Sequence, residues 1–236
     1  MQFSVLPSDE TRQDSARKIG DVLQVVSAAK DWSPRAEDLD RRSFWLDRVF
    51  AVTVLISTAP LLLAIALAIK AEAPRAPILF RQWRTGLGGR RFKLWKFRTM
   101  VPEAERTKPA LAHLSLVAWP DFKVPDDPRI TGVGRILRRF AIDEIPNFVN
   151  VLMGDMKVVG PRPTSFPASS YAPWQRARLR VPPGVTGAWQ IARAREEGFD
   201  ARVAHDLRYI AIRDLGTDLR ILAATIPAVL RRRAAY

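Results

Sequence analysis

The longest uncharged stretch of the chain constrains its fold more than any other feature. Residues 49 to 69 are 21 consecutive residues without a charge, and most of them are Leu, Ile, Val or Ala. A straight helix of that length would measure about 32 Å, and the hydrocarbon core of a bilayer is about 30 Å thick. The stretch therefore predicts a membrane helix.

Two features favour a re-entrant hairpin over a simple membrane span. Pro60 lies in the middle of the stretch and can break a helix into two apolar arms of about ten residues, each too short to span. Both flanks are basic, and Lys and Arg in short loops mark the cytoplasmic side. A spanning helix with a proline kink remains the alternative, because membrane helices tolerate proline.

The apolar segment divides the chain into three parts. We expect a flexible tail over residues 1–40, a re-entrant membrane helix over 41–73 and a cytoplasmic catalytic domain over 74–236. In the last part, glycines between two short apolar runs predict a small β-hairpin with strands at 78–83 and 91–97. Helices are expected at 101–118, 134–140, 145–153 and 206–233, and ordered loops between residues 160 and 187.

The predicted fold class is thus α+β and predominantly helical: a membrane-associated monotopic domain with a broken-helix hairpin, a β-hairpin and amphipathic interfacial helices. The apolar residues of the C-terminal helix recur at nearly helical spacing, and the helix ends in three arginines. It could lie on an anionic membrane face, or pack on the core with a solvated basic end. Both interpretations stay open.

The charge of the chain indicates an anionic partner. Lys and Arg number 38 against 24 Asp and Glu, which gives a net charge of +14. Nucleic acid, anionic lipid and phosphorylated small molecules all fit this sign. The chain has no cysteine, which excludes disulfides and thiolate catalysis, and its two histidines, His113 and His205, lie too far apart in sequence to suggest a metal site.

Residues 126 to 163 interleave carboxylates and guanidinium groups with turn-forming residues. Arginine side chains hold phosphate oxygens in pairs, and Mg²⁺ prefers carboxylate oxygens together with substrate phosphates. The segment therefore predicts a site for a diphosphate and a divalent cation. Asp143 and Glu144 are adjacent within it, so that one carboxylate could attack phosphorus while the other holds the metal. An isolated Asp-Glu pair would more often be an ordinary helix start.

The surrounding motifs give the pair its significance, because the chain from about residue 44 to 233 resembles the small monotopic phosphoglycosyl transferases, also called bacterial sugar transferases. The matching pieces are Phe80-Arg81-Gln82 with Arg84 and Gly86, Lys96-Phe97-Arg98-Thr99-Met100, Asp127-Pro128-Arg129-Ile130-Thr131, Gly134-Arg135, Asp143-Glu144-Ile145-Pro146, Asn150-Val151-Leu152, Gly154-Asp155-Met156, Gly160-Pro161-Arg162-Pro163, and Pro183-Gly184-Val185-Thr186-Gly187 with Gln190.

The resemblance implies a reaction at the cytoplasmic face of the bacterial inner membrane, the first membrane step of exopolysaccharide, capsule or glycan assembly. Asp143 would attack the sugar-linked phosphate of a UDP-sugar and release UMP, leaving a covalent phosphosugar on the aspartate. Polyprenyl (undecaprenyl) phosphate would then take the phosphosugar. Mg²⁺ would be held by Glu144 with Asp143, and the substrates by Lys96, Arg98, Arg129, Arg135, Arg138, Asn150, Asp155, Pro161, Arg162, Pro163 and Gln190.

The sequence departs from the family pattern at three places. Ala59 precedes the proline where serine is common, so Ser57 or Thr58 would have to satisfy the freed carbonyls. Ala141 stands two residues before Asp143 in place of a hydroxyl residue. Ile191 and Ala192 follow Gln190 where a glycine-arginine pair is common.

Two other readings compete with a phosphoglycosyl transferase. A non-catalytic, membrane-tethered basic module could use the positive charge to bind nucleic acid or anionic lipid. However, the arginines cluster with acidic residues rather than in a basic stripe, and nucleic-acid-binding motifs are absent, so we expect no nucleic acid partner. A catalytically silent homologue is the other possibility.

Overall fold

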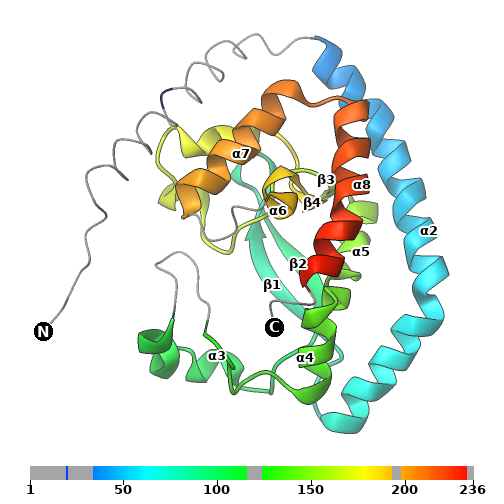
Figure 1. The fold of residues 1–236 in the computed structure, drawn as a ribbon, viewed down its shortest axis with the longest axis vertical. Coiled ribbons are helices and arrows are strands. Elements are labelled where there is room, and N and C mark those ends of the chain that lie inside the picture. The colour runs from blue at the N-terminus through cyan, green and yellow to red at the C-terminus, as the bar shows by residue number, and fades with distance from the viewer. Residues whose placement is uncertain (1–19, 21–33, 116–123, 193–197, 233–236) are drawn as a thin grey trace, which may run out of the picture.

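The computed structural model describes residues 20, 34–115, 124–192 and 198–232, and helices dominate it (Figure 1). The expected tail over residues 1–40 therefore lies largely outside the described residues. The helices are α2 (Pro34–Glu72), α3 (Ala104–Thr107), α4 (Gly132–Arg139), α5 (Asn147–Met153), α6 (Ala188–Ile191), α7 (Phe199–Ile212) and α8 (Leu215–Arg232). The strands are β1 (Leu79–Thr85), β2 (Arg91–Phe97), β3 (Lys157–Val159) and β4 (Gly184–Thr186). The predicted class, α+β with mostly helix, is confirmed.

Helix α2 contains the apolar segment and continues through Pro60. The predicted break into two helices is therefore absent, and α2 instead follows a bent course around one side of the molecule (Figure 1). The hydroxyls of Ser57 and Thr58 donate to the carbonyl of Val54, at 3.1 and 2.6 Å, rather than to the Ile56 carbonyl that proline leaves without its usual donor. A proline together with such hydroxyl bonds to the previous turn accounts for a bend.

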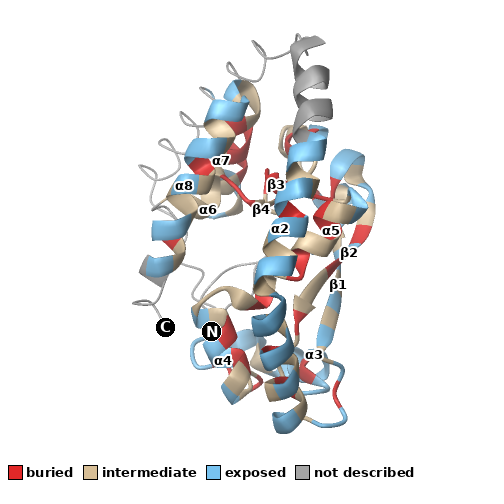
Figure 2. Ribbon diagram, turned by 90° about the vertical axis from the view of Figure 1, so that its right-hand side faces the viewer, coloured by how far each residue is buried: buried red, intermediate tan, exposed pale blue. Residues whose placement is uncertain are grey.

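Only a narrow stripe of α2 packs against the rest of the protein. Ala51, Ile65 and Ile69 are buried, whereas Ile56 and Leu63 are more than 60% exposed. By length and composition, the part from Phe44 to Glu72 could cross a membrane, yet only 11% of its most apolar window is buried (Figure 2). An apolar helix with this much exposed surface is unlike the core helix of a soluble domain.

Strands β1 and β2 form the predicted antiparallel hairpin, with Leu79 opposite Phe97 and Thr85 opposite Arg91. Phe80, Gln82 and Arg84 alternate along one face of β1. On the same face of β2, Phe92 and Leu94 are buried in the main core. On this face of the hairpin, β2 therefore contributes apolar side chains to the core, and β1 contributes polar side chains next to them.

The short parallel pair β3–β4 was not predicted, since residues 160 to 187 were expected to form loops only. Lys157 pairs with Gly184 and Val159 with Thr186. A Cβ at Gly184 would lie 2.0 Å from the backbone nitrogen of Gly160, so only glycine permits this close approach.

Two predicted helices were wrong in extent. The helix expected over 206–233 is divided into α7 and α8 at Asp214, whose carboxylate accepts a 2.6 Å bond from the amide of Thr217 and caps α8. The helix expected over 101–118 is reduced to α3 and a 3₁₀ turn (Pro109–Leu114), because Pro109 cannot continue the α-helical hydrogen bonding. On α8, Ile221 and Ala228 are buried and Leu219 and Ile226 exposed, so the helix packs on the core and also has an exposed apolar face.

The end of α2 is tied to the start of α4. The carboxylate of Glu72 accepts hydrogen bonds from the amides of Gly132, at 2.7 Å, and Val133, at 3.1 Å. A carboxylate at a helix N-terminus satisfies unpaired amides and is favoured by the helix dipole. At the other side of α4, the Cβ of any residue but glycine at position 134 would lie 2.1 Å from the carbonyl oxygen of Thr99. These contacts fix the helix that leads into Asp143.

Candidate active site

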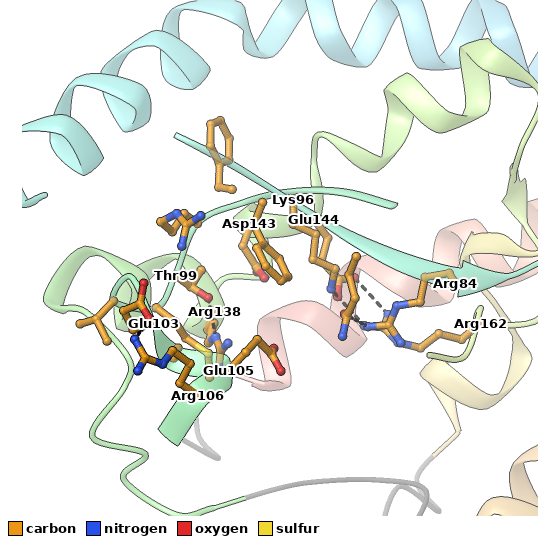
Figure 3. Close-up of a pocket in the computed structure, with 17 residues that line it drawn as sticks. Arg84, Lys96, Thr99, Glu103, Glu105, Arg106, Arg138, Asp143, Glu144 and Arg162 are labelled. Carbon is orange, nitrogen blue, oxygen red and sulfur yellow. Dashed lines mark hydrogen bonds and ion pairs between the residues drawn. The ribbon is translucent and has the colours of Figure 1, made fainter. Parts of the chain in front are cut away.

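A cavity of about 550 Å³ lies against β1 and β2 and is closed by the Asp143–Glu144 turn and the segment around α3 (Figure 3). Six basic side chains and four carboxylates line it. Among them are six of the predicted site residues, namely Lys96, Arg98, Arg138, Asp143, Glu144 and Arg162. Arg84 and Arg162 lie at one end of the cavity and Arg106 and Arg138 at the other, with Asp143 between them (Figure 3).

Asp143 is placed by a sharp change of backbone direction. Ala141 has a positive φ of 54°, which ends α4 and starts a 3₁₀ turn (Ile142–Glu144). A non-glycine residue in this left-handed region costs about 1–2 kcal/mol. In a 3₁₀ turn successive side chains point about 120° apart, so Asp143 and Glu144 face different surroundings.

The Asp143 carboxylate is buried but has no fixed partner. No hydrogen bond or ion pair joins it to another residue in the described part of the chain. Burial raises the pKa of Asp143 above its ordinary value, and the positive charge of Lys96 only partly opposes this shift. A carboxylate that lacks hydrogen-bond donors and points into a cavity retains its lone pairs for attack or for a metal ion.

Glu144 is held tightly, in contrast to Asp143. Its carboxylate accepts a 2.7 Å bond from Nζ of Lys96 and two bonds from Arg162, one of them 3.1 Å long from Nη1 to Oε2. Burial alone would raise the pKa of Glu144, but the charges of Arg162 and Lys96 hold it well below its ordinary value. Glu144 is therefore an ionised anchor for two cations.

The basic side chains at this end of the cavity lie close enough to repel one another. Burial, and next the nearby charge of Arg162, lowers the pKa of Arg84 to about 10. Burial also lowers the pKa of Lys96, although Glu144 opposes that shift. The Nε atom of Arg84 is buried without a hydrogen-bond partner in the described chain. Glu144 pairs with Lys96 and Arg162, and Arg84 lies near the same carboxylate, so an anionic ligand here would be favoured.

Two predicted substrate ligands, Arg129 and Arg135, lie outside this cavity. Arg129 is buried in an ion pair with Asp127, with Nη2 and Oδ2 2.6 Å apart, and also donates to the carbonyl of Ala104. Arg135 is exposed on α4. The structure thus places Arg129 where it supports the chain beneath α3.

Asn150 and Asp155, also predicted as substrate ligands, connect α5 to β2. Asn150 accepts a 3.0 Å bond from the amide of Trp95 and donates to the carbonyl of Lys93 at 2.8 Å. It also donates to Asp155 at 3.3 Å, and Asp155 pairs with Arg90. Their position supports the hairpin behind the cavity.

This position predicts that Asn150→Leu lowers stability more than substrate affinity. It would leave the part-buried amide of Trp95 and carbonyl of Lys93 unpaired, at up to about 1–3 kcal/mol each. Asn147→Leu is the matched control, since Asn147 lies one turn earlier, is also buried, and has an Oδ1 without a partner in the described chain. Thermal melts should show a large loss for Asn150→Leu alone. A raised donor KM with unchanged melting would instead indicate substrate contact.

The remaining predicted residues flank Arg162 or lie behind Glu144. Pro161 and Pro163 are buried on either side of Arg162, and the Pro161 carbonyl accepts from the amide of Gly184 at 3.0 Å. Gln190 donates to the carbonyl of Val185 at 2.9 Å and lines a second cavity, which Glu144 also reaches.

Sequence reasoning missed several residues of the cavity, among them Gln82, Arg84, Glu103, Glu105 and Arg106. The alternation of polar residues along β1 was the available signal. In register with β2, Phe80 lies opposite Lys96, so every second residue of β1 shares the face of that lysine. Gln82 and Arg84 could have been found in this way.

The acidic residues of the cavity fit a magnesium ion that takes most of its ligands from elsewhere. Within the described residues, no three His, Cys, Asp or Glu side chains gather into a metal-binding group. Mg²⁺ commonly uses one or two carboxylates and completes its shell with water and substrate phosphate. Asp143 has free lone pairs for this purpose, whereas Glu144 would have to share its oxygens with Lys96 and Arg162.

Comparison with known proteins places the chain in a family. The model of the family described as bacterial sugar transferase matches residues 41–232, which is most of the chain. The chain belongs to the bacterial sugar transferase family. All the residues of its main cavity lie inside the matched region.

The curated relatives are named as transferases or as an exopolysaccharide production protein. The chain is 38% identical over 219 residues to the undecaprenyl-phosphate galactose phosphotransferase of Salmonella typhimurium, covering 91% of this chain and 45% of that protein. It is 41% identical over 207 residues to the UDP-glucose:undecaprenyl-phosphate glucose-1-phosphate transferase of Caulobacter vibrioides, covering 84% and 73%. It is 35% identical over 203 residues to the exopolysaccharide production protein ExoY of Sinorhizobium fredii, covering 84% and 88%. This bacterial sugar transferase thus spans less than half of the Salmonella relative.

Proposed function

We propose that this bacterial sugar transferase moves a phosphosugar from a UDP-sugar to polyprenyl (undecaprenyl) phosphate, giving a polyprenyl-diphosphate sugar and UMP. The carboxylate of Asp143, which has no partner in the described part of the chain, lies in one cavity with Arg84, Lys96 and Arg162, and this arrangement carries the proposal. The names of the relatives supply the two substrates, because one names UDP-glucose with undecaprenyl phosphate and another names galactose with undecaprenyl phosphate.

In the first step, an Oδ atom of Asp143 attacks the phosphorus that bears the sugar. A bond forms between this oxygen and phosphorus, and the bond from phosphorus to the bridging oxygen breaks. UMP leaves with the bridging oxygen and its electron pair. Arg84, Lys96 and Arg162 face the diphosphate and balance the charge that develops on the transferring group.

In the second step, a phosphate oxygen of the polyprenyl phosphate attacks the same phosphorus. The bond to the Asp143 oxygen breaks, and the free carboxylate returns. Neither step requires a general base, because both nucleophiles are oxyanions. This fits a cavity whose lining contains no histidine.

Mg²⁺ is the metal that the carboxylates of this cavity would take, with Asp143 as the more available ligand and Glu144 as the second. When bound, it would reduce the negative charge of the diphosphate. Glu144 keeps Lys96 and Arg162 oriented toward the same phosphates.

Helix α2 would hold the protein to the bacterial inner membrane, with the cavity on the cytoplasmic face. Its exposed apolar surface supports membrane association. The bend at Pro60 supports a re-entrant course, in which both ends of the helix return to the cytoplasmic side. Cysteine accessibility at positions 41 and 75 tests this course, because labelling from opposite sides of the membrane would exclude it.

UMP release from a panel of UDP-sugars, with Mg²⁺ in detergent and with polyprenyl phosphate as acceptor, tests the function directly. Release with at least one sugar, together with a lipid-linked product, is expected. Absence of release over the whole panel, alongside salt-sensitive binding to DNA or anionic vesicles, would favour a non-catalytic basic module. The unpaired carboxylate argues against such a module, because a surface built only to hold anions gains nothing from it.

A further inference from the structure

A second cavity, of about 120 Å³, lies on the other side of Glu144 from the first. It is enclosed by the segment from Ala141 to Phe148, by β4 and α6, and by α8. Glu144 lines both cavities. Glu144 therefore borders both the charged cavity and this second cavity.

The second cavity is mainly apolar. Seven of the side chains that line it are Ala, Ile, Val or Phe, and Glu144 is the one charged residue among the described residues of its lining. Most of its other polar groups bond within the wall: the hydroxyls of Thr186 and Thr225 are 2.7 Å apart, and Gln190 donates to the Val185 carbonyl, which leaves its buried Oε1 without a hydrogen-bond partner in the described chain. Few polar groups are thus left to hold a sugar or a base, which require hydrogen bonds.

The cavity lies next to the apolar surface of α2. Phe148 lines it, and the ring of Phe148 lies 6.0 Å from the ring of Phe50, centroid to centroid. Phe50 belongs to the long apolar segment of α2 and is 41% exposed. In the ribbon, α5 lies beside α2 (Figure 1). Apolar side chains therefore lead from the exposed surface of α2 to Glu144.

We propose that this cavity binds the first isoprene units of the polyprenyl phosphate, so that the lipid phosphate reaches Asp143 past Glu144. The inference rests on the proposed function and names a place for its acceptor. The donor would occupy the charged cavity and the lipid chain the apolar one. Separate cavities explain how a water-soluble and a membrane-held substrate use one nucleophile.

Filling the cavity tests the inference. Ala228 is buried in its wall, and Ala228→Phe would occupy the space. Ala223→Phe is the matched control, because Ala223 lies on the same helix and is exposed. Two rates are measured for each protein: exchange of labelled UMP into UDP-sugar, which reports the donor step, and formation of polyprenyl-diphosphate sugar.

The ratio of lipid product to UMP exchange should fall about tenfold or more in Ala228→Phe, since even one methylene that fits a hydrophobic pocket badly changes selectivity by about 10- to 200-fold. It should stay within about twofold in Ala223→Phe. An unchanged ratio in Ala228→Phe would overturn the inference. Absence of UMP exchange in the unaltered protein would instead overturn the proposed function, so the two failures are distinguishable.

Photolabelling of the unaltered chain gives a test that does not depend on folding of the variant. The probe is a farnesyl phosphate with a diazirine on its second isoprene unit. Peptides that contain Phe148 or Ala228 should be labelled, and undecaprenyl phosphate should compete. Labelling confined to other segments would show that the lipid chain binds elsewhere.

Discussion

Replacing Asp143 by asparagine is expected to abolish sugar-phosphate transfer while raising the melting temperature of the protein. Asparagine cannot form the covalent phosphosugar, and loss of a nucleophile costs roughly 10⁴- to 10⁶-fold in kcat. Stability should move in the opposite direction. Burial raises the pKa of Asp143, so the ionised carboxylate opposes folding at neutral pH, and an uncharged side chain removes this cost.

The pH dependence follows from the sign of that shift. When the pKa of an acid is raised on folding, the acid binds more protons in the folded protein than in the unfolded chain. Stability therefore falls as the pH rises from the unfolded-state pKa to the folded-state pKa. The gain in Asp143→Asn should be complete once the pH exceeds the raised folded-state pKa of Asp143 and should vanish below the ordinary aspartate value of about 4. Asp126→Asn is the control, because Asp126 is exposed, and neither activity nor melting should change. Labelled donor that still modifies the asparagine variant, or an unchanged turnover, would refute the nucleophile.

Replacing the adjacent residue, in Glu144→Gln, should also reduce transfer but should destabilise the protein. The variant would leave Arg84, Lys96 and Arg162 without the carboxylate that now separates their charges. Loss of such an electrostatic contact costs about 10²- to 10³-fold in kcat. A buried charged partner left unsatisfied costs about 1–3 kcal/mol or more of stability.

The sign of the pKa shift of Glu144 is opposite to that of Asp143. A carboxylate whose pKa is lowered in the folded state stabilises the protein at any pH above its pKa in the unfolded chain, about 4.3. This stabilisation is lost as the pH falls through the pKa of the folded state. The melting difference of Glu144→Gln should therefore be full at neutral pH and disappear in acid. Glu103→Gln, which breaks the exposed ion pair with Arg106, is the control and should shift stability by less than about 1 kcal/mol. Equal melting of both variants would contradict the anchoring role of Glu144.

The sequence predicted local features of this fold better than distant ones. The β-hairpin and the Asp143–Glu144 turn were found because glycine turns and motif spacing are local signals. The pair β3–β4 was missed, since two three-residue strands separated by 24 residues leave no periodic pattern. Pro60 predicted a broken helix, but packing and neighbouring hydroxyls let α2 continue with a bend.

The sequence predicted which polar residue types form the candidate site, but it could not predict which groups each of these side chains would contact. Arg129 and Arg162 have the same chemistry, yet one is buried against Asp127 and the other faces the cavity. Asn150 lies in a matching motif and bonds only to the protein scaffold among the described residues. Sequence spacing does not distinguish these outcomes, because both uses of a guanidinium or amide require the same atoms.

The bond from Glu72 to α4 has a consequence for the setting in which the protein works. The same side chain ends the long apolar helix α2 and starts the helix that leads into Asp143, the proposed nucleophile. In the proposed membrane setting, the height of the Asp143 carboxylate above the hydrocarbon boundary is set by how deeply α2 is immersed. A thicker or thinner bilayer should alter the distance from this carboxylate to the acceptor phosphate, and reaction rate should follow acyl-chain length.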